Sequence, residues 1–380
     1  MKKLLVFGLI LLLVGSALFA DDASVMPAMV GRFYVAPIYS FAMNEFDTDG
    51  KSHSLPGDDT SLKVFDLGFA LEFGITNWIT AAVQWVPGWT PWSNIRAATE
   101  MYDTNTNGVA DIFAGAKFLL VGENAPFSVS AIRFAAAPGV IIPLPGPNLA
   151  DQFNKMDLMA SDGKGATLAA MDNHVFAAGG RFYFDYVFNK NFFINLYNQT
   201  IIYPFKQNLD KADVKFQKTK FGAVNNPYGD PEIQGLLDGL AAYGIDKNEI
   251  YNISGDVGFG YSLTFELEPV FSMPIADGIN FSAGLPVTYN FKPAYSYSFS
   301  YPDALAPMAD MITPKIKGEL DTDPHHILYL NPNASIFFMK TPLPLEFKLT
   351  YGFPVWGKNA MARHNASLQI RAYFALPGAR

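Results

Sequence analysis

The sequence predicts an all-β fold: a transmembrane antiparallel up-and-down β-barrel of about twelve strands. Apolar and polar residues alternate over many stretches, short turns alternate with long connections, and 50% of the residues are hydrophobic. No apolar run of roughly eighteen residues follows the N-terminal region, so membrane helices are not expected. A hydrophobic chain of this kind crosses a bilayer as a closed barrel, because lipid offers the backbone amides no other partner. Composition alone leaves a soluble sandwich or solenoid as the alternative.

The N-terminus has the order of a bacterial signal peptide. Two lysines precede the apolar stretch 4–14, and Asp21 and Asp22 follow a few small residues later. Cleavage is expected after Ala20, which leaves residues 21–380 as the barrel. Loss of the two lysines changes the formal charge from −8 to −10. An exported protein this acidic is not expected to bind nucleic acid.

The sequence contains no cysteine, which excludes disulfide bonds, thiol catalysis and a lipidated N-terminal cysteine. No cofactor or metal is expected. The predicted location is the outer membrane, reached through a Sec-type signal peptide and crossed many times. The expected partners are the lipid bilayer, lipopolysaccharide or an equivalent outer-leaflet lipid, and the barrel-assembly machinery. Nothing in the sequence indicates an oligomeric state.

The clearest alternation covers residues 61–74. Phe65 and Leu67 point to one side of this stretch, whereas Asp66 and Glu72 point to the other. A strand with one apolar face and one small or charged face is typical of a wall between lipid and a wet lumen. The sequence therefore predicts a membrane-spanning strand here.

Two further long alternations cover residues 253–267 and 279–291. In the first, Ile253, Val257 and Phe259 open the apolar set that is expected to face lipid. Shorter alternations complete the count at 30–42, 77–87, 108–121, 126–142, 174–188, 191–205, 325–339, 343–356 and 364–376. An even number of strands is typical of a single-chain bacterial barrel.

Connection lengths provide an independent test, because such barrels have short periplasmic turns and long external loops. Short connections rich in turn-forming residues lie at 76–77, 122–125, 189–191, 276–278 and 340–342. Long connections lie at about 43–60, 88–107, 143–173, 206–250 and 301–324, with a shorter one at 357–363. A soluble sandwich has no reason to place every long loop at one end, so the alternation favours the barrel, with both termini in the periplasm.

The tryptophans lie near predicted strand ends, at Trp78, Trp85, Trp89, Trp92 and Trp356. Anchoring at the level of the lipid headgroups is the preferred interpretation, and stacking on a ligand is the alternative.

Two segments, 71–78 (LEFGITNW) and 108–118 (GVADIFAGAKF), resemble a group of outer-membrane barrels. This group includes the phenol-degradation meta-pathway proteins and relatives of the hydrophobic-compound transporters. The resemblance implies passive uptake of small molecules through a porin-like channel. The chain departs from the long-chain fatty-acid transporters, because only about ten residues precede the first strand and no plugging N-terminal hatch is expected.

Alternation also predicts which charged side chains face the lumen. The candidate pore-lining residues are Asp66, Glu72, Asp111, Lys117, Arg133, Arg181, Asp185, Asp256, Glu266, Glu268, Glu346, Lys348 and Arg371, and Arg32 has the same orientation. Opposite charges across a narrow lumen are expected to pair and hold the wall together. The functional interpretation is a polar constriction that selects small solutes, and the two interpretations are compatible.

Two loop features suggest local structure. Residues 231–245 have near-helical apolar spacing after Asp230, a candidate N-cap, and predict a short helix. This helix either folds into the barrel mouth or packs on neighbouring loops. Residues 103–111 space oxygen ligands as in a calcium loop, but Ala114 replaces the final glutamate, so a turn is the preferred interpretation.

Catalysis is not expected. His364 and Ser367 are the nearest approach to a catalytic pair, but alternation sends them to opposite faces of one strand. The sequence therefore predicts a narrow porin-like channel for passive uptake of small solutes, hydrophobic or aromatic ones among them. The alternative is a surface interaction protein of the adhesin kind, in which the barrel displays its loops, including the apolar stretch 156–171.

Overall fold

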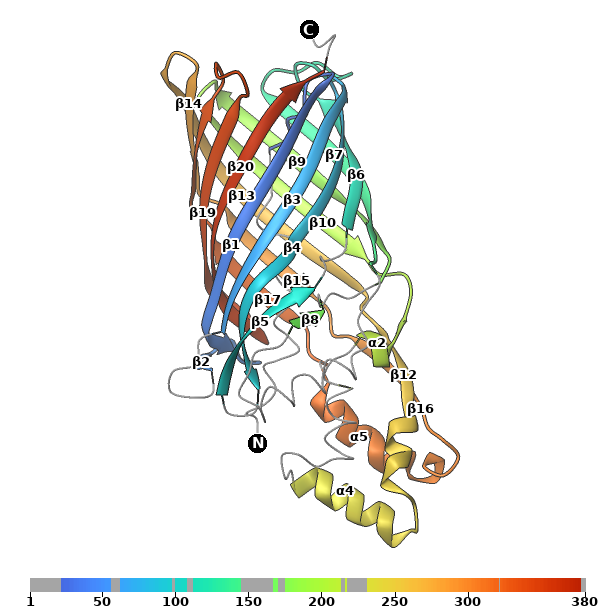
Figure 1. Ribbon diagram of the computed structural model, residues 1–380. Helices are drawn as coiled ribbons and strands as arrows, with labels where there is room; N and C mark the ends of the chain where they lie inside the picture. The colour runs from blue at the N-terminus through green and yellow to red at the C-terminus, as the bar shows by residue number, and fades with distance from the viewer. Residues whose placement is uncertain are drawn as a thin grey trace.

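The computed structural model describes residues 22–55, 62–97, 100–107, 112–144, 167–169, 175–212, 216, 231–320 and 322–376. They form a closed antiparallel barrel of 12 strands, as the sequence predicts (Figure 1). The barrel strands are β1 (Val30–Phe46), β3 (Leu62–Thr76), β4 (Ile79–Ala97), β6 (Ile112–Val121), β7 (Ile132–Ile142), β9 (Ala177–Asn189), β10 (Phe192–Ile202), β13 (Tyr261–Ala276), β14 (Ile279–Gly284) with β15 (Val287–Lys292), β17 (His325–Leu330) with β18 (Asn333–Phe338), β19 (Leu345–Lys358) and β20 (Ala360–Ala375).

Each barrel strand pairs with the barrel strands before and after it in the chain, and β20 pairs with β1 from Val30↔Ala375 to Phe46↔Ala360. This last pairing closes the sheet on itself and leaves no free edge. The short turns and the C-terminus gather at one end of the barrel, and the long connections gather at the other (Figure 1). Closure gives the backbone amides of the strands hydrogen-bond partners, which lipid cannot provide.

Burial along the strands is inverted relative to a soluble protein. In β3, Asp66 is 2% exposed and Glu72 is 8% exposed, whereas Leu71 is 45% exposed. In β13, Thr264, Glu266 and Glu268 are buried, and the alternate residues Phe265 and Leu267 are exposed. The apolar outer face fits a lipid environment, and the polar face lines the interior. No helix among the described residues has the length and apolar character needed to cross a membrane.

The strand β4 is longer than the predicted stretch 77–87, because a bulge lets it continue. Gly88 has a φ of +86°, and a Cβ at this position would overlap the carbonyl of Leu67 on β3. Beyond Gly88 the pairing resumes at Trp89↔Leu67 and Trp92↔Phe65. Trp85, Trp89 and Trp92 therefore lie within the strand, and their predicted place near strand ends is wrong.

The predicted loop 88–107 is also wrong over most of its length. It contains the last half of β4 and β5 (Glu100–Asn107), which pair as an antiparallel hairpin. Asp103 to Asn107 are thus extended, which is neither the expected turn nor a calcium loop. Residues 108–111 of that motif lie outside the described residues.

Two neighbouring strands are each interrupted by a proline. The break between β14 and β15 contains Pro286, and the break between β17 and β18 contains Pro332. The carbonyls of both prolines still accept cross-strand bonds, from the amides of Asn331 and Tyr351. Proline has no amide hydrogen to donate to the neighbouring strand, so each strand is interrupted at its proline. The barrel wall nevertheless continues through both positions.

The long connections carry a cap beyond the end of the barrel (Figure 1). A small sheet orders β11 (Gln207–Asn208), β12 (Ser254–Gly258) and β16 (Ser296–Ser300). Its helical elements are α2 (Leu209–Ala212), α4 (Pro231–Ala242), η1 (Lys247–Asn252), η2 (Ala306–Met308) and α5 (Ala309–Glu319). β2 (Ser52–Ser54) and β8 (Thr167–Ala169) pair with β1 and β5. The helix expected within 231–245 is confirmed as α4, and α5 was not anticipated.

The outer face allows a direct test of the lipid environment. Leu267, in the middle of β13, and Leu343, in the turn before β19, are both 46% exposed. We expect Leu267→Arg to lower the free energy of unfolding by about 2–4 kcal/mol and Leu343→Arg by about 0–1 kcal/mol, because a charge is costly only in the hydrocarbon region. Urea titration of the protein in lipid vesicles measures both, and equal effects would contradict a membrane-spanning β13.

Candidate functional site in the barrel lumen

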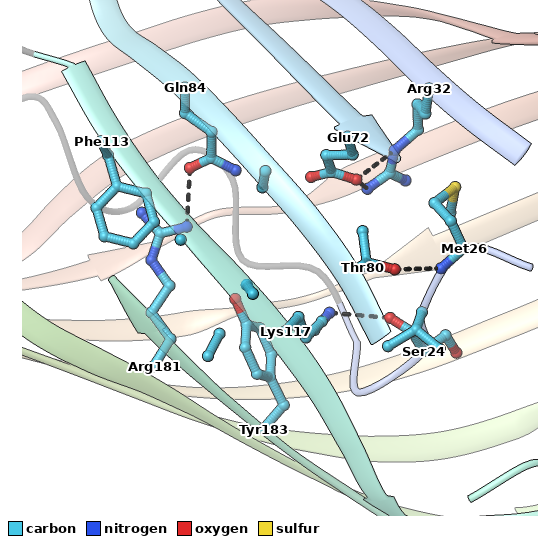
Figure 2. A pocket seen from close by; sticks show the side chains of 15 residues that line it. Ser24, Met26, Arg32, Glu72, Thr80, Gln84, Phe113, Lys117, Arg181 and Tyr183 are labelled. Atoms are coloured by element: carbon cyan, nitrogen blue, oxygen red, sulfur yellow. Dashed lines mark hydrogen bonds and ion pairs between the residues drawn. The ribbon is translucent and has the colours of Figure 1, made fainter. Parts of the chain in front are cut away.

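Residues 22–26, ahead of β1, lie inside the barrel (Figure 2), and residues 27–29 lie at its rim. This N-terminal segment, residues 22–29, is anchored to inner-face groups of β3, β4 and their connecting turn. The amide of Met26 donates to Thr80 Oγ1 at 2.8 Å, that of Ala28 to Asn77 Oδ1 at 2.9 Å, and that of Met29 to the Gly74 carbonyl at 2.8 Å. The segment is far shorter than a hatch, but the sequence did not predict that it enters the lumen.

Charged side chains hold the inner end of the segment. Lys117 Nζ donates to the carbonyls of Asp22 at 2.6 Å and Ser24 at 3.0 Å. Arg133 Nη1 donates to Ser24 Oγ at 2.8 Å and lies 3.5 Å from the Asp22 carboxylate. Asp185, which is fully buried, accepts from the Ala23 amide at 3.1 Å. Lys117, Arg133 and Asp185 are thus three predicted site residues brought together around the segment.

Small apolar side chains of the segment fill the space between these contacts. Ala23 is completely buried with Tyr183 and Tyr197, and Val25 packs against the same cluster. Met29 has a φ of +64°, a backbone conformation that non-glycine residues rarely adopt, and it turns the chain from the segment into β1. The Met29 carbonyl also accepts from the amide of Leu376, just after β20, at 2.9 Å.

A small cavity lies beside the segment. Figure 2 shows Arg181 crossing it toward Gln84, with Lys117 and Ser24 on another side. Arg181 Nη1 donates to Gln84 Oε1 at 2.8 Å, and its guanidinium lies 4.0 Å from the Phe113 ring centroid. The space open to water-sized molecules is about 40 Å³. A water needs roughly 10–15 Å³ by this measure, so the cavity admits only a few waters while the segment is in place.

Two buried ion pairs brace the wall nearby. Arg32 Nε donates to Glu72 Oε2 at 3.0 Å across β1 and β3. Arg371 Nη1 lies 3.3 Å from Glu346 Oε2 across β19 and β20, and the Tyr373 hydroxyl donates to the same carboxylate oxygen at 2.7 Å. Both pairs join directly opposite residues of neighbouring strands, and neither crosses the lumen as expected from the sequence.

The other candidates are distributed over the rest of the inner face. Asp66 accepts from the Thr90 hydroxyl. Glu266 accepts from Thr288 Oγ1 at 2.6 Å, and Glu268 accepts from Asn333 Nδ2 at 2.8 Å. Lys348 lies half-buried on β19, and Asp111 lies outside the described residues.

Asp256 is not part of the barrel. It is exposed on β12, in the small sheet of the cap. The chain leaves the wall at Gly260, whose φ is +69°, so the predicted strand 253–267 is divided there. Ile253, Val257 and Phe259, expected to face lipid, are instead at most 3% exposed within the cap.

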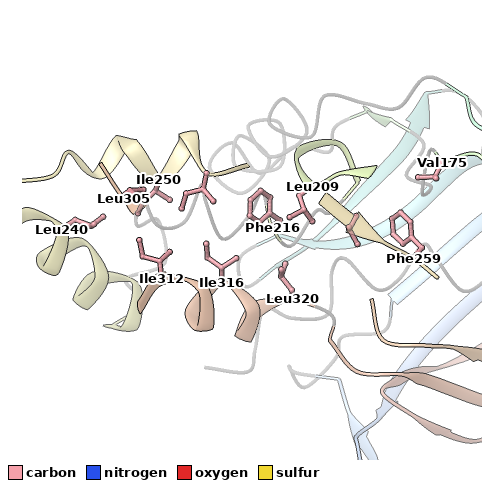
Figure 3. Packing of buried hydrophobic residues seen from close by; sticks show 12 residues of the cluster. Val175, Leu209, Phe216, Leu240, Ile250, Phe259, Leu305, Ile312, Ile316 and Leu320 are labelled. Atoms are coloured by element: carbon pink, nitrogen blue, oxygen red, sulfur yellow. The ribbon is translucent and has the colours of Figure 1, made fainter. Parts of the chain in front are cut away.

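The cap has an apolar core of its own, as Figure 3 shows. Leu240 of α4 and Ile312 and Ile316 of α5 pack with residues of the small sheet and of the helical turns. Of the two placements left open for the helix, packing on neighbouring loops is confirmed, and insertion into the barrel mouth is not observed (Figure 1).

Several residues of the site were missed. Gln84 and Gln199 hold Arg181, and Asn195 donates to Asp185 at 2.6 Å. Alternation within the predicted strands 77–87 and 191–205 orients these amides inward. Nothing in the local sequence distinguishes these uncharged amides from the other polar residues of the inner face.

No grouping of three or more metal-ligating side chains occurs among the described residues. His364 stacks on Phe41 with ring centroids 4.9 Å apart and lies 3.1 Å from the Tyr351 hydroxyl, whereas Ser367 is buried on the opposite face of β20. His364 and Ser367 therefore do not form a catalytic pair.

No protein-family model and no curated protein sequence matches the chain. Among solved structures, the crystal structure of the COG4313 outer membrane channel from Pseudomonas putida F1 matches with a TM-score of 0.56 and 12% identity, over 94% of this chain and 100% of that one. The chain shares this outer-membrane barrel fold. The NanC porin (TM-score 0.37, 9% identity, 90% and 100% covered) and the P. putida toluene transporter TodX (0.36, 9%, 95% and 94%) also match.

The Arg32–Glu72 pair predicts a non-additive effect on stability. Glu72→Ala leaves the buried guanidinium without this carboxylate, so we expect the free energy of unfolding to fall by about 3–5 kcal/mol. The double variant with Arg32→Met is expected to recover most of this loss, because it removes the buried charge. Urea titration of the two single variants and the double variant gives the coupling, and strictly additive losses would contradict a paired role.

Proposed function

We propose that the protein is a narrow porin-like outer-membrane channel for passive uptake of small solutes, closed at rest by its own N-terminal segment. One observation carries this proposal: the inner wall of the barrel is polar, and residues 22–29 are hydrogen-bonded to it. The COG4313 protein of the same fold is described as a channel, which supports the proposal. More specifically, we propose that the solutes include hydrophobic or aromatic molecules. The proposed function involves no catalysis.

The proposal includes the cellular context that the sequence suggests. A Sec-type signal peptide is removed before residue 21, the assembly machinery inserts the barrel, and lipopolysaccharide or an equivalent lipid surrounds the outer leaflet. The short turns face the periplasm, so the segment enters the lumen from that side. The alternative function, a surface protein that binds partners through its loops, stays a prediction. Most of the apolar loop stretch 156–171 lies outside the described residues.

Opening requires the segment to move, and its attachment is modest. The segment is held by a handful of hydrogen bonds, each worth about 0.5–1.5 kcal/mol net, and by small side chains. A closed state favoured by only a few kcal/mol leaves an open state populated at roughly 0.1–10%. Brief openings of a small pore are the expected electrical behaviour.

Gly74 offers a way to displace the segment. A Cβ on this residue would overlap the backbone carbonyls of Met26 and Pro27. We expect Gly74→Val to push the segment from its seat and to raise the mean single-channel conductance or the open probability several-fold in planar bilayers.

Gly180→Ala is the matched control, because the nearest atoms to its added Cβ lie 3.8 Å away, in ordinary contact. It tests the effect of replacing a wall glycine without touching the segment. A Gly74→Val barrel that folds, shown by its heat-modifiable mobility on gels, yet conducts no better than wild type would refute closure by the segment.

A further inference from the structure

Three cations of the lumen lie on neighbouring strands of the wall. Lys117, Arg133 and Arg181 lie on β6, β7 and β9, consecutive strands of the barrel. Arg133 Nε lies 2.8 Å from the buried Asp185 carboxylate, which also accepts from Asn195 Nδ2. Over the described residues of these three strands, three cations stand against one carboxylate, that of Asp185, which gives the strands an excess of positive charge.

The N-terminal segment meets this excess with oxygen atoms. Lys117 binds two backbone carbonyls, and Arg133 binds a hydroxyl and approaches the Asp22 carboxylate. Both cations contact Ser24, so a group as small as one residue reaches them together. When the segment leaves, these partly buried donors need new acceptors, because a desolvated cation without them is costly.

Apolar and aromatic side chains line the cavity beside the polar Thr80 and Gln84. Phe113 and Tyr183 present rings to it, each with a cation 4.0 Å from its centroid, and Ala82 and Ala137 add small apolar surface. Once the segment has left, these side chains offer a compact apolar body surface to pack against. The cations Arg32, Lys117 and Arg181 outnumber the one acid, Glu72, among the charged residues lining the cavity.

From this geometry we propose that Lys117 and Arg133 form a carboxylate-binding site, and that the channel favours small organic carboxylates with a compact apolar body. The inference rests on the proposed channel function and names its solute class. The carboxylate takes the place of the Asp22 and Ser24 oxygens, so solute and segment compete for the same donors. A neutral solute of equal shape leaves the donors unmet, and an organic cation is repelled.

Ion permeation through single channels tests the proposal. The full chain lacking only residues 22–27 is reconstituted in planar bilayers, and reversal potentials are measured in gradients of sodium benzoate and of benzylammonium chloride. These two organic ions have similar size and opposite charge. We expect benzoate to be about tenfold more permeant than benzylammonium, the equivalent of one added charge-assisted hydrogen bond.

Lys117→Gln and Arg133→Gln are each expected to reduce this permeability ratio several-fold. Lys190→Gln, which removes a charge from the exposed turn between β9 and β10, is the matched control and is expected to keep it. Heat-modifiable mobility identifies folded barrels. A conducting channel with a ratio near one, or a ratio that Lys117→Gln and Arg133→Gln leave unchanged, would overturn the site alone. Absence of conductance would overturn the channel function and the site with it.

Discussion

The hydrogen bonds between β1 and β20 are the interaction on which the rest of the structure depends. Without them both strands would present unpaired amides to lipid, where each is costly. Once the sheet is closed, successive side chains of a barrel strand point alternately to two environments, the lipid and the lumen. The apolar faces of β3 and β13 and their buried carboxylates are consequences of the same closure.

Closure also creates the electrostatic problem that the lumen residues solve. Carboxylates and guanidinium groups such as Glu72 and Arg32 are enclosed in a space with little water, so each needs a partner nearby. Most find one on the neighbouring strand. The wall of β6, β7 and β9 is different, because part of its compensation comes from the N-terminal segment, which is not a strand of the barrel. The lumen therefore contains two kinds of contact: ion pairs between neighbouring strands, and contacts between wall cations and the N-terminal segment.

The strand count, the connection pattern and the inward face of β3 could be predicted from the sequence because each strand carries its own alternation. Alternation, however, reports only that a strand has two different sides. It did not show that Val257 faces a cap core instead of lipid, since both environments select apolar residues. A glycine such as Gly88 predicts the start of a loop, but its positive φ instead makes a bulge within β4. The contact of Ser24 with Arg133 spans 109 residues, and no local pattern signals such a meeting.

Met29 belongs to two structures at once. Its amide fixes the segment to Gly74, and its carbonyl receives the amide of Leu376 beside the seam of the barrel. What occupies the lumen is thereby tied to the join between the first and last strands. A displacement of the segment would pull on a residue that also bonds to the chain just after β20, so the position of the segment and the stability of the closed barrel depend on the same hydrogen bonds.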